Sequence, residues 1–211
     1  MINNRNCYVI LTAKKESKRL QNKLWLKLNE KYLWQYCFET ISNSDYIDHI
    51  VICTDDERFL NMVCYNTNKT VYSIPEPDIL LQKQIIDVLK YSSDKMNYKS
   101  DDFIIWIDLC NPFIKLAQLK TCIEQMEKYN YHSLFETKKV RYNIYGLENE
   151  YDEFYHSWSI RIRTKKTIDN STNKWGIGID HGTMNIAEDY EISIDYPHDL
   201  IIAEALLRNG Y

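Results

Sequence analysis

Residues 7–23 read CYVILTAKKESKRLQNK, an apolar run that ends abruptly in a segment rich in Lys and Arg. The run Cys7–Thr12 is short and almost continuously apolar, which predicts a buried strand. Further along, apolar residues recur every three or four positions over Leu33–Ile41, and this spacing predicts a helix. Strand, loop and helix in this order indicate the first unit of an α/β fold.

The same alternation continues along the chain. Further strands are predicted at His49–Thr54, Thr70–Ser73, Phe103–Ile107 and Ser133–Thr137. Helices are predicted at Glu57–Val63, Leu81–Tyr91 and Lys115–Lys128. Phe103–Ile107 is the most continuous apolar run and is predicted to be a central strand, covered on both faces. We therefore expect an α/β fold with a doubly wound, mostly parallel sheet, whose ligands bind beyond the carboxyl ends of the strands.

Residues 138–170 break this rhythm. They are rich in Tyr and Arg, and Trp158–Arg163 alternates with period two, which predicts a β excursion from the sheet. Because Tyr, Trp and Arg are enriched in interface cores, the segment is predicted to be a dimerisation arm or a lid over the active site. An ordinary solvated hairpin is the alternative. After it we expect a short strand that ends at Asp195 and a helix with Pro197 near its first position.

Length and composition limit the classes of protein to consider. The 211 residues are 45% hydrophobic and 27% charged with few Gly and Pro, so we expect one globular domain over residues 1–211. The net charge of −4 argues against a nucleic-acid partner, which basic surfaces usually hold. No apolar run approaches the ~18 residues of a membrane span, and the first residues are too short and polar for a signal peptide.

The six cysteines are scattered and form no C-x-x-C pair. Several lie inside apolar runs, which is typical of buried thiols in a reducing compartment rather than of disulfides or zinc ligands. A cytoplasmic protein is expected. The five histidines are too dispersed to suggest a metal site, so we interpret them as structural or surface residues.

The loop after the first predicted strand concentrates positive charge at a strand end. Lysine and arginine occupy five of its positions: Lys14, Lys15, Lys18, Arg19 and Lys23. A triphosphate site needs cations together with hydroxyl or amide donors, and Ser17 beside Lys18 supplies both. No glycine occurs before Gly146, which excludes the glycine-rich dinucleotide and P-loop motifs here. The alternative is that this segment is only a solvated, Lys-rich turn.

Four segments resemble the CMP-acylneuraminate synthetase (acylneuraminate cytidylyltransferase) family, of which the chain would be a divergent member. The loop segment LTAKKESKRLQNK is similar to the family's L-x-A-R-x-G-S-K-R-L-P-x-K, and VICTDD at 51–56 to its V-x-S-T-D-D. IDLCNPF at 107–113 and IDYPHDLIIAE at 194–204 lie where the family has L-Q-P-T-S-P-L and I-D-T-x-x-D-x-x-L-A-E. The resemblance leaves residues 138–170 unmatched.

The resemblance implies that the chain transfers CMP from CTP to an acidic sugar or a similar small acid and releases pyrophosphate. It implies Mg²⁺ as the cofactor and a homodimer formed through the excursion. Roles follow for named residues: catalysis at Lys18 and Lys23, nucleotide binding at Ala13, Lys14, Ser17, Lys18 and Asp108, and metal binding at Asp195 and Asp108. Such a reaction depends on positioning and charge neutralisation more than on covalent chemistry.

Each acidic residue of the candidate site also has a purely structural interpretation. Asp108 could only form the turn at the end of its strand, and Asp195 could cap the following helix. We interpret Asp55 and Asp56 as the cap and first turn of a helix, and Asp199 as a helix-dipole residue. Cys110 is interpreted as a buried core thiol.

The chain also departs from the family pattern. Glu16 places a carboxylate in the loop, and Lys14 replaces an arginine, which keeps the charge but loses the bidentate fork. Asp108 stands where the family has glutamine, and Ser193 replaces the first of two paired aspartates. Residues 108–113, DLCNPF, are also similar to D-A-A-R-P-F of the methylerythritol phosphate cytidylyltransferases. The alternative function is therefore a degenerate relative that binds a nucleotide or a partner without turnover.

Overall fold

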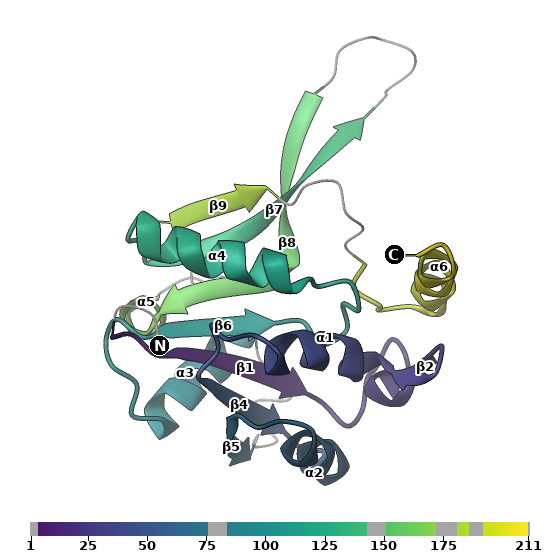
Figure 1. Ribbon diagram of the computed structural model, residues 1–211, viewed down its shortest axis with the longest axis horizontal. Coiled ribbons are helices and arrows are strands. Elements are labelled where there is room, and N and C mark those ends of the chain that lie inside the picture. Colours follow the sequence, from purple (N-terminus) through teal and green to yellow (C-terminus); the bar gives the residue numbers. More distant parts are fainter. Residues whose placement is uncertain (1–3, 76–83, 143–150, 172–180, 186–191, 211) are drawn as a thin grey trace.

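The computed structural model describes residues 4–75, 84–142, 151–171, 181–185 and 192–210. Its centre is a seven-stranded sheet in the order β5-β4-β1-β6-β8-β7-β9 (Figure 1). The strands are β1 (Cys7–Ala13), β4 (His49–Thr54), β5 (Thr70–Pro75), β6 (Phe103–Ile107), β7 (Ser133–Tyr142), β8 (Tyr151–Thr164) and β9 (His181–Asn185). Only β8 runs antiparallel to its neighbours among these strands. The expected mostly parallel α/β sheet is confirmed.

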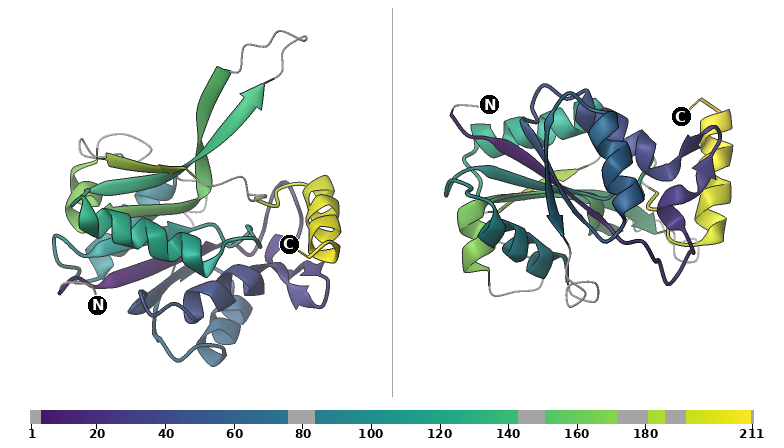
Figure 2. Two further views of the ribbon diagram at one scale, coloured as in Figure 1. Left: turned by 45° about the horizontal axis from the view of Figure 1, so that its top comes forward. Right: turned by 90° about the horizontal axis from the view of Figure 1, so that it is seen from below.

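Helices cover both faces of the sheet, as Figures 1 and 2 show. One face packs against α1 (Leu33–Ser42), α2 (Glu57–Tyr65) and α4 (Leu116–Lys128). The other packs against α3 (Ile85–Lys95) and α5 (Lys165–Asn170). Alternate residues of β1 enter the two cores, Val9 on the first and Ile10 on the second, and both are fully buried. A strand covered on both faces must be apolar throughout, which explains the continuous run at residues 7–11.

A smaller unit lies beside the carboxyl ends of the central strands. It consists of the short helix η1 (Lys23–Trp25), the hairpin of β2 (Lys27–Leu28) and β3 (Lys31–Tyr32), and the helix α6 (Pro197–Arg208). Leu28, Leu33, Ile194 and Ala203 are buried together in its core. Both views in Figure 2 keep α6 next to this hairpin. Segments from the beginning and the end of the described chain, β2 and α6, thus meet at one end of the sheet.

Most expected elements agree with the structure, and the differences have physical reasons. The strands β4 and β6 have the predicted bounds, whereas the helix expected at 81–91 spans Ile85–Lys95, residues 81–83 lying outside the described part. The strand expected before Asp195 does not form over 192–195, the part of it that the structure describes. There Ile194 donates a backbone hydrogen bond to the Cys110 carbonyl at 2.9 Å, outside any sheet.

The excursion expected at 138–170 is only partly separate from the sheet. The second half of β8, from Ile160 to Thr164, pairs antiparallel with β6 and is therefore a central strand. Beyond an irregularity between Phe135 and Thr137, β7 and β8 continue as a ribbon that leaves the body of the molecule (Figure 1). Residues 165–170, expected to be β, form α5, which Thr164 caps by accepting from the Thr167 amide. The tip of the ribbon, 143–150, lies outside the described residues.

The expectations for the cysteines and for membrane spans can be compared with the described residues. None of the six cysteines forms a disulfide. Four are buried, but Cys64 is exposed and Cys110 is half-buried, so the prediction of buried thiols is wrong for Cys64 and only partly met by Cys110. Within the described ranges, no helix is both long enough and apolar enough to cross a bilayer.

Candidate active site

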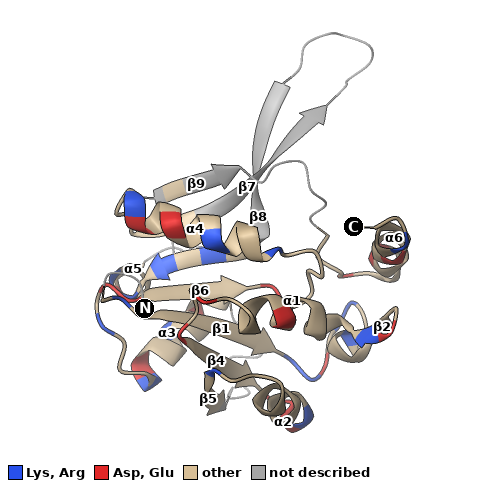
Figure 3. Ribbon diagram, viewed as in Figure 1, with Lys and Arg blue, Asp and Glu red and all other residues tan. Residues whose placement is uncertain are grey.

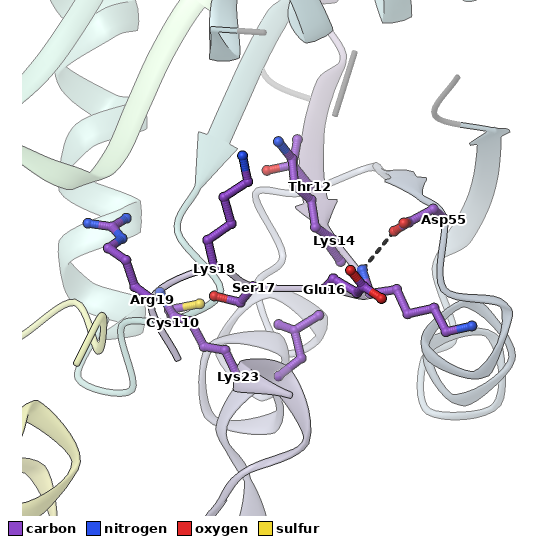
Figure 4. A pocket seen from close by; sticks show the side chains of 12 residues that line it. Thr12, Lys14, Glu16, Ser17, Lys18, Arg19, Lys23, Asp55 and Cys110 are labelled. Carbon is purple, nitrogen blue, oxygen red and sulfur yellow. Dashed lines mark hydrogen bonds between the residues drawn. The ribbon is translucent and has the colours of Figure 1, made fainter. Parts of the chain in front are cut away.

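A pocket of about 790 Å³ opens at the carboxyl ends of the central strands (Figure 4). Its wall comes from the end of β1, the basic loop, η1, the turn after β4 and the turn after β6. The lining residues are Thr12, Ala13, Lys14, Lys15, Glu16, Ser17, Lys18, Arg19, Lys23, Leu24, Asp55 and Cys110. Segments predicted to carry functional residues after three strands therefore meet at one place, because β4, β1 and β6 are neighbours in the sheet.

Hydrogen bonds to the end of β4 fix the start of the basic loop. The Thr54 hydroxyl donates to the Ala13 carbonyl at 2.6 Å, and the Lys15 amide donates to Asp55 Oδ1 at 2.7 Å. Asp55 is thus a support for the loop backbone and does not cap α2. The cap lies one residue later than expected, at Asp56, which accepts from the Phe59 amide at 3.1 Å.

The loop presents several cationic side chains to the pocket, and it is correspondingly blue in Figure 3. Lys14, Lys18 and Arg19 are exposed, while Ser17 is half-buried beneath them. In Figure 4 the Lys18 side chain extends away from the loop backbone, and the Glu16 carboxylate lies on the Asp55 side of the pocket. Glu16 lines the pocket nonetheless, so its negative charge acts on any anion bound there.

Lys23 is held by a carboxylate from the far end of the sequence. Its Nζ donates to Asp195 Oδ1 at 2.7 Å, and Arg19 Nη1 lies 2.9 Å from Asp195 Oδ2. Burial disfavours the charged form of Lys23, but the neighbouring Cys110, Asp108 and Asp195 outweigh it, so the pKa of Lys23 is raised. Lys23 therefore carries a positive charge at neutral pH. Asp195 does not cap α6, whose N-cap is Tyr196.

Asp108 lies behind the pocket wall and organises the turn after β6. Its Oδ1 accepts from the Cys110 amide at 3.0 Å. This bond forms the turn at the end of the strand that was expected if Asp108 has only a structural role. Its Oδ2 accepts from the Ser193 hydroxyl at 2.6 Å. Cys110, rather than Asp108, faces the pocket. Contact between Asp108 and a nucleotide or metal stays a prediction.

Cys110 has the character of an inert thiol although it lines the pocket. Burial, with a smaller contribution from Asp108, raises its pKa to about 12, and Lys23 opposes this shift. Because the thiolate is the reactive form, Cys110 is a poor nucleophile at neutral pH.

Asp199 supports the backbone at the start of α6, next to the candidate site. Asp199 Oδ2 accepts from the amides of Asp195 and Tyr196 at 2.9 and 2.8 Å, so it fixes the start of α6 as well as favouring the helix dipole. Among the described residues, no three His, Cys, Asp or Glu side chains gather in a way that could hold a metal ion by themselves.

Two residues of the site were not singled out from the sequence. Arg19 was recognised only as part of the charged loop, yet it bonds Asp195, and Ser193 was noted only as a departure, yet it bonds Asp108. Neither contact has a local signal, because the partners lie far apart along the chain.

Comparison with known proteins identifies related sequences. Residues 8–150 match a family model described as cytidylyltransferase. The chain is 25% identical over 137 residues to 3-deoxy-manno-octulosonate cytidylyltransferase 2 of Hydrogenovibrio crunogenus, a match that covers 65% of this chain and 53% of that protein. It is 26% identical over 155 residues to an uncharacterized protein of Methanocaldococcus jannaschii, covering 71% of this chain and 58% of that one. The matched part thus spans little more than half of these relatives.

Solved structures share the fold. A CMP:2-keto-3-deoxy-manno-octonic acid synthetase complexed with CTP has a TM-score of 0.75 at 14% identity, covering 98% of this chain and 100% of that one. The 4-diphosphocytidyl-2C-methyl-D-erythritol synthase of Anaerococcus prevotii has a TM-score of 0.71 at 13% identity, covering 97% and 99%. At these identities the likeness establishes the fold alone.

Proposed function

The chain belongs to the cytidylyltransferase family, and from that premise we propose that it transfers CMP from CTP to a hydroxyl group of an acidic sugar or a similar small acid. In this reaction the acceptor oxygen attacks the α-phosphorus and forms a new P–O bond. The bond from the α-phosphorus to the oxygen bridging to the β-phosphate breaks, pyrophosphate leaves, and the acceptor hydroxyl loses its proton.

The observation that carries the proposal is the pocket at the end of β1, where Lys14, Ser17 and Lys18 face the same space as the charged Lys23. A triphosphate brings about four negative charges, and it needs cations and hydrogen-bond donors that converge on its oxygens. Ser17 provides a hydroxyl donor, and Ala13 lies where the β1 backbone reaches the pocket. We infer that Lys18 and Lys23 neutralise the charge that moves onto the leaving pyrophosphate.

The acceptor proposal is less specific than the nucleotide proposal. One relative is a cytidylyltransferase of 3-deoxy-manno-octulosonate, an acidic sugar, whereas four sequence segments resemble acylneuraminate cytidylyltransferases. We therefore propose an acidic sugar as the class and test both sugars. We also propose that the projecting part of residues 138–170, the ribbon of β7 and β8, forms a homodimer contact or covers the acceptor, because it extends away from the body (Figure 1).

Magnesium fits the donors near the pocket when it is bound together with the nucleotide. Mg²⁺ takes hard oxygen ligands, commonly one or two carboxylates with substrate phosphates and waters. Asp195 offers such a carboxylate beside two residues of the pocket wall, and Asp108 is a second one near Lys23. We propose that Asp195, with Asp108, holds the ion. Bound there, Mg²⁺ would supply further neutralisation of the triphosphate.

The proposal is tested with pyrophosphate release from CTP, ATP, GTP and UTP in the presence of 3-deoxy-manno-octulosonate or N-acetylneuraminate. Release with CTP and one of these acceptors is expected, and Lys18→Ala should reduce it about a hundredfold, as loss of a transition-state donor does elsewhere. Lys166→Ala is the matched control, because Lys166 is an exposed lysine of α5, outside the pocket wall. Equal release by Lys18→Ala and the wild type would reject the role given to the loop.

A binding protein without turnover is the second candidate, and the Glu16 carboxylate in the pocket wall favours it. On that candidate, CTP or CMP raises the melting temperature, but no acceptor leads to pyrophosphate release. A thermal shift with each nucleotide, measured with and without Mg²⁺, identifies the nucleotide that either candidate binds. Pyrophosphate release with that nucleotide and a panel of acidic sugars then separates the two candidates.

A further inference from the structure

Both carboxylate oxygens of Asp195 are bonded to cations of the protein itself. Lys23 Nζ is 2.7 Å from Oδ1, and Arg19 Nη1 is 2.9 Å from Oδ2. Both cations line the pocket proposed for the triphosphate. A metal ion that approached Asp195 first would therefore have to compete with two positive charges for the same two oxygens.

Lys23 and Arg19 differ in how deeply their side chains are buried beside Asp195. The Lys23 side chain is only 13% exposed and lies between Asp195, Asp108 and Cys110, whereas the Arg19 side chain is 57% exposed. An exposed ion pair is worth little in water, on the order of 1 kcal/mol or less. Arg19 can therefore leave Asp195 at small cost, while Lys23 stays.

The position of Asp195 itself is fixed independently of Arg19. Its amide donates to Asp199 Oδ2 at 2.9 Å, and the preceding Ile194 amide donates to the Cys110 carbonyl at 2.9 Å. Departure of Arg19 thus frees one oxygen of a carboxylate that remains in place. While paired with Asp195, Arg19 also has its guanidinium carbon 5.7 Å from the centre of the Tyr196 ring.

From these contacts we propose that Arg19 is a latch that sets the order of binding: nucleotide first, divalent metal second. The arriving triphosphate draws the Arg19 guanidinium from Asp195 to a phosphate oxygen, for which a guanidinium fork is well suited. The same event exposes Asp195 Oδ2 to the metal. Nucleotide and metal binding are then positively coupled, and by linkage each raises the affinity for the other. This inference rests on the proposed function of the same site.

Binding of the metal alone gives the sharpest test, and Mn²⁺ is the probe because its free and bound forms differ in electron paramagnetic resonance. Without nucleotide, the wild type should bind Mn²⁺ weakly, and Arg19→Ala should bind it about threefold to fivefold more tightly, which is the loss of one exposed ion pair. Arg19→Lys, which keeps a cation, should behave like the wild type. Asp195→Asn in the Arg19→Ala background should abolish the gain.

Arg208→Ala is the matched control, because Arg208 is also an exposed arginine that pairs with one carboxylate, Glu204, at 3.8 Å. It should leave Mn²⁺ affinity unchanged. Equal Mn²⁺ affinity of the wild type and Arg19→Ala would overturn the latch.

Calorimetric titration with CTP in EDTA separates failure of the latch from failure of the proposed function. Binding of CTP without metal, together with unequal Mn²⁺ affinities, supports the latch. Binding of CTP with equal Mn²⁺ affinities rejects the latch and keeps the nucleotide site. No binding of CTP, with or without metal, rejects the proposed function and the latch with it.

Discussion

The two ends of the parallel strands use charged residues in opposite ways. At the amino end, the buried Asp102 accepts from the Asn6 and Lys99 amides at 2.9 and 2.8 Å, and Asp48 accepts from the Cys7 amide at 2.9 Å. At the carboxyl end, Lys14 and Lys18 are exposed around a pocket. At the amino end these carboxylates bond the backbone. At the carboxyl end a carboxylate such as Asp55 also bonds the backbone, but cations beside it face solvent around the pocket. Stability and binding are therefore expected to respond to different ends.

The largest effect is expected from two matched lysines, one at each end. Lys23→Met should lower pyrophosphate release from CTP by about 10²–10³-fold, because it removes a charge at the developing leaving group. Lys69 is also half-buried, and its Nζ donates to the carbonyls of Ser44 and Ile47, both at 2.8 Å, before β4 and β5 begin. Lys69→Met should lower stability and leave turnover per folded molecule unchanged. Similar turnover in both variants would contradict the assignment of binding to the carboxyl end and of stability to the amino end.

A second test addresses the amino end. Asp102→Ala removes the acceptor of two backbone amides, so the free energy of unfolding should fall by about 2–4 kcal/mol, as expected for buried donors left unsatisfied. Asp101→Ala is the control, since the Asp101 side chain is 63% exposed and only pairs with Arg5 at 3.6 Å. Denaturant unfolding followed by circular dichroism measures both. Equal losses for the two neighbours would contradict the role given to Asp102.

The smallest effect is expected from Glu16, whose carboxylate lies in the pocket wall among the cations. Glu16→Gln should tighten CTP binding about twofold to fivefold, because it removes one exposed negative charge from the wall of an anion site. Calorimetry at low salt measures it, with Glu30→Gln as the control on the exposed β2–β3 turn. The gain should shrink as ionic strength rises. Weaker binding of CTP by the Glu16 variant would indicate that this carboxylate contacts the base or sugar instead.

Sequence reasoning was most successful where burial on two faces forces a pattern. The runs at His49–Thr54 and Phe103–Ile107 are strands with the predicted bounds, since a parallel strand covered on both faces has a nearly continuous apolar interior. It failed for β8, because insertion of Ile160–Thr164 between β6 and β7 is decided by pairing and not by local periodicity. The helix at 165–170 was missed since its cap, Thr164, lies inside a segment of strand-like alternation.

The candidate site was predictable in part for the same reason. Residues at the ends of neighbouring parallel strands must meet, so the basic loop, Asp55 and the turn at Cys110 could be placed together. Pairing within the site could not be predicted, because contacts such as Ser193 with Asp108 depend on where a segment outside the sheet comes to lie. The exposure of Cys64 could not be predicted either, because this residue of α2 faces solvent although its neighbours in the sequence are apolar.

The bond between Lys23 and Asp195 joins residues 172 positions apart. Closing so long a loop in an unfolded chain costs about 5 kcal/mol of chain entropy in the simplest polymer estimate, more than one ion pair returns. The contact can therefore form only after the sheet and the α6 core have brought its partners together. During synthesis the basic loop emerges well before Asp195, so an unfinished chain displays the cations without the residue that restrains them.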